Sequence, residues 1–390
     1  KNTIAIIGNS DGVIENIAPN IFDVVPQVQH SHQVVFEDLD LDGDLDLIMS
    51  EAGLDVPPYT GGDIVLALNN VDGYENITIP DEISGARAYA ITAGDLDSDG
   101  VVELIIADTY RAVFDNNFNG ITLNFNNKEN ITYEINSTPN FQKYLNASTF
   151  FSGDYDNDGK LDLFVGGMWS SPNHTIYFDA MNATEATILP ETVYGHKAWQ
   201  EIKDNGGTYS GADVNAITQG DFDNDGDIDI ISIVEEVTMT GTSEGVDIVY
   251  GPGVTITTLQ NNGNKSFSTV TQGNFDSNLG ALYYNSINTS DINNDGLIDL
   301  FAHYWDKTNN DVWFTTLFIN KGDLQFQKYD VDSFLGNYQN SGLIIPTGRH
   351  ENNGAEVLIV KTSDFWSELI IESHLSSIQI SEDLSYIEFS

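Results

Sequence analysis

Apolar and polar residues alternate along most of this chain in short runs, and Gly, Asn and Asp residues separate the runs. Between residues 32 and 80 the runs are HQVVFE, DLIMS, DIVLALNN and YENITIP. Alternating β-branched and aromatic residues bounded by turn-forming residues are typical of short strands. No helical periodicity of useful length competes with this pattern. The stretch therefore predicts a unit of four short antiparallel strands.

The same unit recurs along the chain, and each copy carries an Asp-rich segment after its first strand. The segments are DLDLDGDLD at 38–46, DLDSDGVVE at 95–103, DYDNDGKLD at 154–162, DFDNDGDID at 221–229 and DINNDGLID at 291–299. Their starts are 57, 59, 67 and 70 residues apart, and each segment runs into an apolar stretch. A degenerate sixth copy, GRHENNGAEVLIVK at 348–361, keeps a turn glycine but has lost most of the acids. Self-similarity at a near-constant period indicates a repeat architecture.

Four-stranded repeats of this length predict an all-β, seven-bladed β-propeller of antiparallel blades, because radial repetition leaves only short, protected sheet edges. Counting metal motifs alone gives six blades as the alternative. The opening stretch resembles the second half of the first repeat, so we expect the ring to close by pairing of N- and C-terminal strands. The chain is then one domain, 1–390, with blades at approximately 29–82, 83–140, 141–205, 206–277, 278–333 and 334–382 and a closing blade from 1–28 plus 383–390.

The spacing within each Asp-rich segment is typical of a calcium loop. Calcium takes six to eight oxygen ligands, and a glycine at the sixth loop position permits the sharp turn. Each segment supplies alternating acids, the turn glycine and a final acid at the start of the next strand, and Asp44 can add its carbonyl oxygen. The predicted ligands are Asp38, Asp40, Asp42, Asp44 and Asp46; Asp95, Asp97, Asp99 and Glu103; Asp154, Asp156, Asp158 and Asp162; Asp221, Asp223, Asp225 and Asp229; and Asp291, Asn293, Asp295 and Asp299.

The type of ligand favours calcium over other metals. Magnesium demands tighter octahedral geometry and keeps its waters, and transition metals prefer His or Cys. In the fifth segment Asn293 replaces an acid, which we expect to weaken binding without abolishing it. The prediction is about five bound Ca²⁺ ions. Asp-Gly turns without metal are the alternative for any one segment.

The loops and their apolar followers resemble the FG-GAP/VCBS repeats of integrin α-subunit propellers and of many secreted bacterial proteins, over about residues 1–380. The resemblance implies a seven-bladed propeller with calcium in the loop between the first and second strands of a blade. It also implies that these loops lie on one face and that ligands meet the opposite face. The sixth copy departs from the pattern, so no metal is expected there. Bacterial members include lectin-like modules, adhesins and parts of polysaccharide-degrading enzymes, so the resemblance implies fold and metal rather than a ligand.

The net charge of the chain limits the classes of molecule that it is expected to bind. Sixty acidic residues against 14 basic ones give a formal net charge of −46, spread along the whole chain rather than gathered in a tail. A set of cation sites explains a large share of this charge, and a solvated halophilic surface is the alternative. So acidic a surface repels nucleic acid and anionic membranes. No apolar run is long enough for membrane insertion.

The chain has no cysteine, which favours a microbial source or another means of stapling such as bound metal. The resemblance to secreted proteins leads us to expect a secreted or cell-surface protein. Eight Asn-x-Ser/Thr sequons offer weak support for a glycoprotein, at Asn76, Asn130, Asn136, Asn146, Asn173, Asn182, Asn264 and Asn288.

The loops expected opposite the calcium loops are long and rich in aromatic residues, at 55–62, 108–120, 167–174, 303–313 and the inter-blade stretch 194–211. Trp169 and Trp305 fall at nearly equivalent places in two repeats. Exposed Trp and Tyr beside Asn and Asp suit stacking on sugar rings, and packing between blades is the alternative. We expect a recognition or adhesion module for a glycan or protein ligand, with candidate ligand residues Trp169, Trp305, Tyr59 and Arg111.

Two other functions stay open, and no catalytic residue is assigned. A structural subunit of a surface layer or filament would self-associate through large apolar patches. A polysaccharide hydrolase needs two carboxylates at a defined separation, and a lyase needs a base with cations around it. The scarcity of basic residues argues against a lyase, whose candidate groups would be His196, Lys197, Lys203, Tyr209, Arg111 and His303.

Overall fold

The structure is a computed structural model, and it describes part of the chain. The described residues are 6–8, 14–16, 33–51, 53, 62–70, 73–79, 88–108, 121–125, 131–135, 147–167, 174–182, 185–189, 202, 205–242, 245–273, 282–293, 295–306, 312–330, 343–349, 356–361, 366–371, 379–380 and 387–388. They form two compact units, of which the first comprises Lys1–Ile7, Glu15–Glu191 and Gly263–Ser266 and the second comprises the remainder. The predicted all-β class is confirmed, since the helical assignments in the described part are limited to one 3₁₀ turn, Ala180–Asn182, and to Ile202 and Asn205.

The first unit contains three four-stranded antiparallel sheets whose strands follow one another in chain order. The first sheet is β3 (Val34–Glu37), β4 (Asp46–Met49), β5 (Val65–Asn70) and β6 (Gly73–Ile77). The second is β7 (Ala88–Gly94), β8 (Val102–Asp108), β9 (Ile121–Phe125) and β10 (Ile131–Ile135). The third is β11 (Ala147–Gly153), β12 (Asp162–Gly167), β13 (Thr175–Phe178) and β14 (Glu185–Ile188).

The second unit repeats this arrangement with longer strands. Its first sheet is β15 (Thr208–Gly220), β16 (Asp229–Thr242), β17 (Gly245–Asn261) and β18 (Phe267–Gly273). Its second is β19 (Leu282–Ser290), β20 (Asp299–Asp306), β21 (Val312–Asn320) and β22 (Phe326–Asp330). A three-stranded sheet follows, with β23 (Leu343–Arg349), β24 (Glu356–Lys361) and β25 (Trp366–Ile371).

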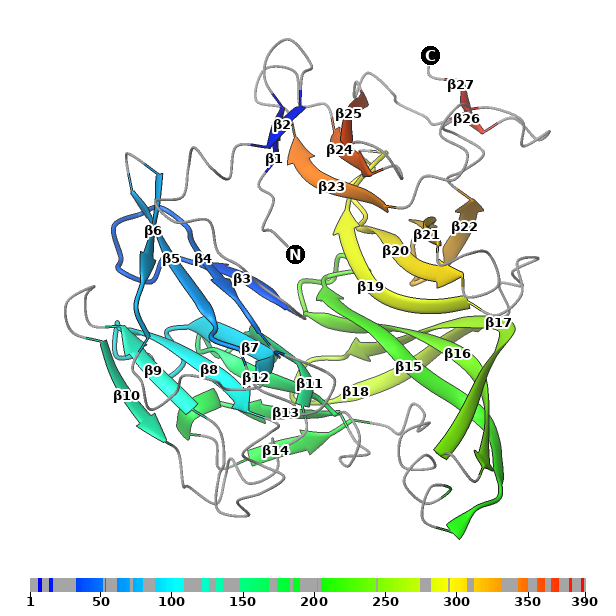
Figure 1. The fold of residues 1–390 in the computed structure, drawn as a ribbon, viewed down its shortest axis with the longest axis horizontal. Helices are drawn as coiled ribbons and strands as arrows, with labels where there is room; N and C mark the ends of the chain where they lie inside the picture. The colour runs from blue at the N-terminus through cyan, green and yellow to red at the C-terminus, as the bar shows by residue number, and fades with distance from the viewer. Residues whose placement is uncertain are drawn as a thin grey trace. The chain divides into compact units, whose positions relative to one another are not determined.

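Within each unit the sheets pack as propeller blades do, with the first strand of one sheet next to the first strand of another. In the first unit β7 lies against both β3 and β11, and in the second unit β19 lies against β15 and β23 (Figure 1). Gln33, just before β3, ties the three first strands of its unit together. Its side-chain amide donates to the carbonyl oxygen of Phe150 at 2.7 Å and its carbonyl oxygen accepts from the amide of Ile91 at 3.2 Å.

Apolar side chains fill the space between successive sheets. One cluster joins the first two sheets through residues such as Ile48, Leu66 and Leu104, and another joins β15–β18 to β19–β22 around Phe222 and Phe318. The sheets that these clusters join therefore bury apolar faces against each other, which accounts for the continuous apolar runs in their second strands. The arrangement within each unit is propeller-like.

The predicted seven blades and their closure are wrong for the part of the chain that the structure describes. That part shows five four-stranded sheets and one three-stranded sheet. The predicted closing strands pair locally instead: β1 (Ile6–Gly8) pairs with β2 (Ile14–Asn16), and β26 (Gln379–Ile380) pairs with β27 (Ile387–Glu388). A ladder closed by a short loop loses less chain entropy than one that joins the two ends of a 390-residue chain. The blade boundaries given above stay a prediction.

The sheet β15–β18 differs from the others by an extension of its first three strands. β17 pairs with β18 through Thr255–Asn261, and its earlier residues pair with β16 beyond the end of β18 (Figure 1). Val237 and Met239 of β16 are buried there against Ile202, with Tyr209 and Val246 packed beside them. The end of the predicted inter-blade loop 194–211 is thus strand, because Thr208–Gly211 belongs to β15. No helix among the described residues is long and apolar enough to cross a membrane.

Candidate metal centres

Every Asp-rich segment connects the first and second strands of a four-stranded sheet. The five segments join β3 to β4, β7 to β8, β11 to β12, β15 to β16, and β19 to β20. In the second unit two of these loops lie side by side, since the side chain of Asn224 donates to the carbonyl oxygen of Gly296 at 2.8 Å. The repeated sequence therefore corresponds to a repeated position in the fold.

The first Asp of each loop organises the turn. Asp38 accepts from the amide of Asp42 through Oδ1 at 3.0 Å and from the amide of Gly43 through Oδ2 at 2.9 Å. The equivalent pair of bonds occurs in all five loops, at Asp95, Asp154, Asp221 and Asp291 as well. One carboxylate thus holds two successive amides, which curls the backbone around it.

The middle positions of the loop complete the same turn. The third acid accepts from the amide two residues further on, as Asp42 does from Asp44 at 3.0 Å, and Asp99, Asp158, Asp225 and Asp295 do likewise. The glycine at the sixth position has φ between +87° and +99° in the five loops, a conformation that a side chain opposes. The backbone at this position therefore requires a glycine, as predicted for Gly43 and its equivalents.

The last acid of each loop has a different environment. Asp46, Asp162, Asp229 and Asp299 have no exposed surface, and Glu103 is 2% exposed. One carboxylate oxygen accepts from the amide that follows the first Asp of the loop, as Asp229 does from Phe222 at 3.2 Å. In the first, third, fourth and fifth loops the other oxygen accepts from an amide at the end of the third strand, as Asp229 does from Asn261 at 2.8 Å, with equivalent bonds from Asn69, Asp179 and Asn320. This buried acid therefore clasps the loop to the third strand.

Burial raises the pKa of these last acids, and the nearby loop carboxylates add to the rise while the amide donors oppose it. The pKa reaches about 6 for Asp46 and Asp162 and about 7 for Glu103, Asp229 and Asp299. The cause is negative charge gathered where water is excluded. A divalent cation beside these groups would favour their ionised form and reverse the effect.

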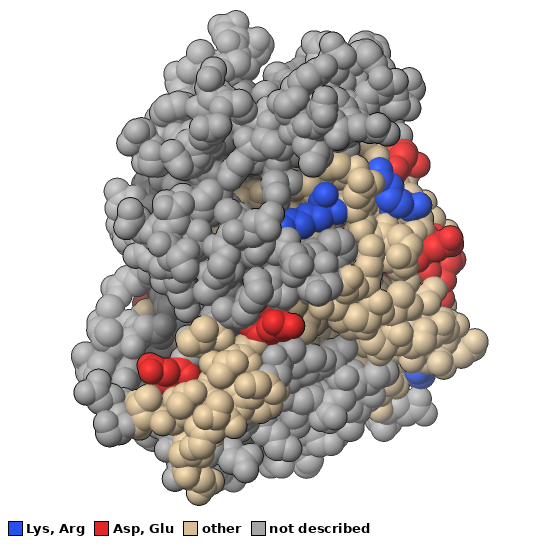
Figure 2. Space-filling model, turned by 90° about the vertical axis from the view of Figure 1, so that its right-hand side faces the viewer, with Lys and Arg blue, Asp and Glu red and all other residues tan. Residues whose placement is uncertain are grey.

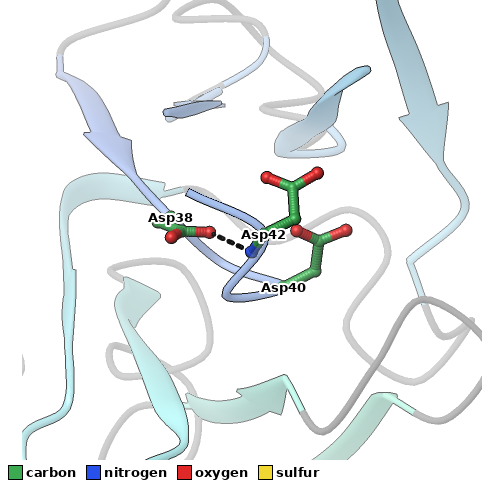
Figure 3. Close-up of side chains that lie close together, drawn as sticks. All are labelled: Asp38, Asp40 and Asp42. Carbon is green, nitrogen blue, oxygen red and sulfur yellow. Dashed lines mark hydrogen bonds between the residues drawn. The ribbon is translucent and has the colours of Figure 1, made fainter. Parts of the chain in front are cut away.

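Four acidic groups among the described residues could hold a metal ion. They are Asp38, Asp40 and Asp42 (Figure 3); Asp95, Asp97 and Asp99; Asp154, Asp156 and Asp162; and Asp221, Asp223 and Asp225. In each group one oxygen per residue lies within 4.8 Å of the others. In Figure 3 the three carboxylates of the first loop project from one tight turn. A set of anionic oxygen donors on so tight a turn fits a hard divalent cation.

The fifth loop keeps the fold of the others with a weaker donor set. The side-chain amide of Asn293 donates to Asp295 at 2.9 Å, and its Oδ1 accepts from the amide of Asp295 at 3.1 Å. An amide oxygen carries no charge, so this loop offers a cation less electrostatic attraction than the other four.

The structure describes some of the remaining predicted residues and not others. Tyr59, Arg111 and Trp169 lie outside the described residues, as does the loop of the degenerate sixth copy between β23 and β24. Trp305 lies in β20, and Trp313, also part of the predicted loop 303–313, lies in β21. The register pairs Trp305 with Tyr283 of β19 and with Trp313. Of the four predicted ligand residues, Trp305 alone lies in the described part, so the grouping of the four stays a prediction.

Two features of the sites escaped sequence reasoning. The residue that closes each clasp stands at the end of the third strand, and an Asn occupies this place at Asn69, Asn261 and Asn320. That recurrence is visible in the sequence. Lys265, whose Nζ lies 3.3 Å from Oδ2 of Asp156, has no such signal because the two residues are far apart in the chain.

On the face drawn in Figure 2, the Asp and Glu side chains of the described residues form several small separate groups, and a few Lys or Arg side chains lie among the described residues there. Comparison with known proteins adds no relative: no family model matches the chain, and no curated protein matches it. The fold and the sites together define an all-β protein of propeller-like sheets with a repeated acidic loop. The likeness to FG-GAP/VCBS repeats rests on the motifs alone.

Proposed function

We propose that the chain is an extracellular calcium-binding propeller that acts as a recognition or adhesion module for a glycan or protein ligand. The observation that carries the calcium proposal is the recurrence of one hydrogen-bonded loop geometry in five sheets, with the first Asp holding two amides and the last acid buried. A turn without metal needs neither three convergent carboxylates nor their repetition. Calcium would neutralise these groups and fix each loop against its sheet, and extracellular calcium concentrations suit loops of modest affinity.

The recognition proposal rests on an aromatic row in the sheet β19–β22. Tyr283, Trp305 and Trp313 occupy directly paired positions on three neighbouring strands. These paired positions lie at the end of β20 away from Asp299 and its loop. Flat aromatic groups at this end suit stacking on sugar rings.

The calcium proposal is tested by thermal melting of the purified chain in millimolar calcium and in chelator. We expect chelation to lower the melting temperature, because an ion that binds the folded state stabilises it by mass action. An unchanged melt, together with no heat of calcium binding in calorimetry, would contradict the proposal.

The recognition proposal is tested by a glycan-array screen in calcium and again in chelator, using the wild type, Trp305→Ala and a matched control, Phe36→Ala. Phe36 is 55% exposed on β3, in the first unit, so its loss removes an aromatic without touching the row. We expect binding to one sugar class in calcium, lost in Trp305→Ala and kept in Phe36→Ala. Equal binding by all three proteins would contradict a role for the row. A blank array would favour a protein ligand or self-association instead.

A further inference from the structure

The third Asp-rich loop has a positively charged side chain of the same protein beside it, that of Lys265. The ammonium group of Lys265 lies 3.3 Å from Oδ2 of Asp156, one of the three acids of the third candidate metal group. The Asp156 side chain is 7% exposed and that of Lys265 is 37% exposed, so the pair is partly shielded from solvent.

The backbone around Lys265 is shaped to place it there. The amide of Ser266 donates to the carbonyl oxygen of Gly263 at 3.1 Å, and Asn264 and Lys265 have φ of 53° and 63°. Two central residues with positive φ define a type I′ turn, which is uncommon for a lysine. The Lys265 ammonium also lies 4.6 Å from the centre of the Phe178 ring, an arrangement that attracts a cation. The turn residues and both partners belong to the first compact unit.

The equivalent turn of the next sheet shows what this position otherwise does. Asp323 and Leu324 also have positive φ, and the amide of Gln325 donates to the carbonyl oxygen of Gly322 at 3.0 Å. Leu324 stands where Lys265 stands in its turn, yet it is 3% exposed and packs in the apolar cluster with Phe222. The same turn thus delivers an apolar side chain to a core in one copy and an ammonium group to an acidic loop in the other.

We propose that Lys265 is a built-in counter-ion of the third loop, and that a divalent cation must displace it from Asp156 to bind there. The inference rests on the proposed calcium function. It makes the loop of Asp154 less dependent on calcium for its stability, and weaker in calcium affinity, than its acids alone would make it. The lysine and the metal are alternatives for the same carboxylate.

The test compares Lys265→Met with Lys160→Met in the full chain. Both substitutions remove one positive charge near the third loop. Lys160, however, pairs with Asp179 at 2.7 Å, and Asp179 is outside the acidic group. Methionine keeps a long apolar stem over Phe178. A third variant, Lys265→Arg, retains the charge.

Calcium affinity is measured by titration of metal-stripped protein against a chromophoric chelator. We expect Lys265→Met to tighten one site by about two- to fivefold, the range that partly exposed ion pairs contribute, and Lys160→Met to change it less. Lys265→Arg should remain close to wild type. Equal tightening in both methionine variants would overturn the proposal in favour of a general charge effect, and so would an unchanged site in Lys265→Met.

Thermal melting supplies a second measurement, in which Lys265→Met should lower the melting temperature in chelator and raise the gain from calcium. In chelator, Lys265→Met should melt below wild type, because Asp156 loses its counter-ion. In saturating calcium, Lys265→Met should show a larger calcium-dependent rise in melting temperature than wild type. A loss of stability of the same size in both conditions would assign Lys265 a packing role only and overturn the inference. Absence of calcium binding in the wild type would overturn the proposed function itself, a result distinct from both.

Discussion

In the fourth loop Asp225 is exposed, whereas Asp229, four residues further along the chain, has no exposed surface. Asp225 belongs to an acidic group open to a cation, and Asp229 accepts two amide hydrogen bonds from separate segments. The same contrast holds in the first and second loops, whereas in the third loop the buried Asp162 is itself a member of the acidic group. In the first, second and fourth loops, acids that look interchangeable in the sequence therefore divide into a metal-facing set and a structural set, and their substitutions should have different consequences.

The largest expected effect is that of Asp229→Ala. It leaves the amides of Phe222 and Asn261 without their acceptor in a buried place, and each unpaired buried group costs about 1–3 kcal/mol. We expect the free energy of unfolding, measured by denaturant titration in chelator, to fall by about 2–4 kcal/mol. Asp225→Ala removes the same charge at the surface and serves as the control. Equal losses of unfolding free energy in the two variants would contradict the division into metal-facing and structural acids.

A smaller effect, and one that depends on calcium, is expected for Asp223→Ala. In chelator the variant should lie within about 1 kcal/mol of wild type, because loss of the hydrogen bond that half-buried Asp223 accepts from the Gln260 side chain is offset by relief of repulsion among the loop acids. In calcium it should lose part of the stabilisation, and calorimetry should count one ion fewer. A drop in stability in chelator as large as that of Asp229→Ala would contradict the assignment of Asp223 to the metal-facing set.

The buried acids also predict how the benefit of calcium varies with pH. Their pKa values of about 6 to 7 in the fold lie above the ordinary value near 4, so without metal the folded state binds more protons between these values. Stability in chelator is then highest near pH 4 on this account and falls as pH rises through 7. We expect melting curves to show a larger gain from calcium at pH 8 than at pH 5. A gain that is constant with pH would show that calcium leaves these acids unaffected.

The smallest effect is expected at the turn glycine. Gly226 has φ of +94°, and a Cβ added there would meet no atom within 4 Å, so Gly226→Ala is opposed by backbone strain alone. We expect a loss of about 1 kcal/mol that is similar with and without calcium, measured by denaturant titration. Gly273→Ala, where an added Cβ meets only ordinary contacts, is the matched control. A larger loss in the control would contradict the strain argument.

Sequence reasoning reached the loops because their chemistry is local. The alternation of Asp38, Asp40 and Asp42 before Gly43 predicts a turn whose groups lie within a few residues of one another, and the hydrogen bonds within the loop confirm that turn. The all-β class follows from the strand pattern in the same way. These features need no knowledge of distant segments.

The features that were missed or mistaken depend on distant contacts. The buried role of Asp229 requires the end of β17, and the Lys265–Asp156 pair joins residues that no periodicity connects. Closure of the ring was inferred from the likeness of the opening stretch to the second half of the first repeat, but a pattern does not say which of two compatible strands will pair. The extension of β15–β17 was hidden because Gly211 and neighbouring polar residues are typical of a loop.

The clasp formed by the last acid also determines how a blade can open. Asp229 joins the loop after β15 to the end of β17, so a movement that pulls this carboxylate away frees one amide in each of the two elements. The two elements therefore behave as one cooperative unit in native-state fluctuations. Departure of an ion from the exposed acids would then be felt at the amide of Asn261, whose hydrogen exchange should accelerate together with that of Phe222.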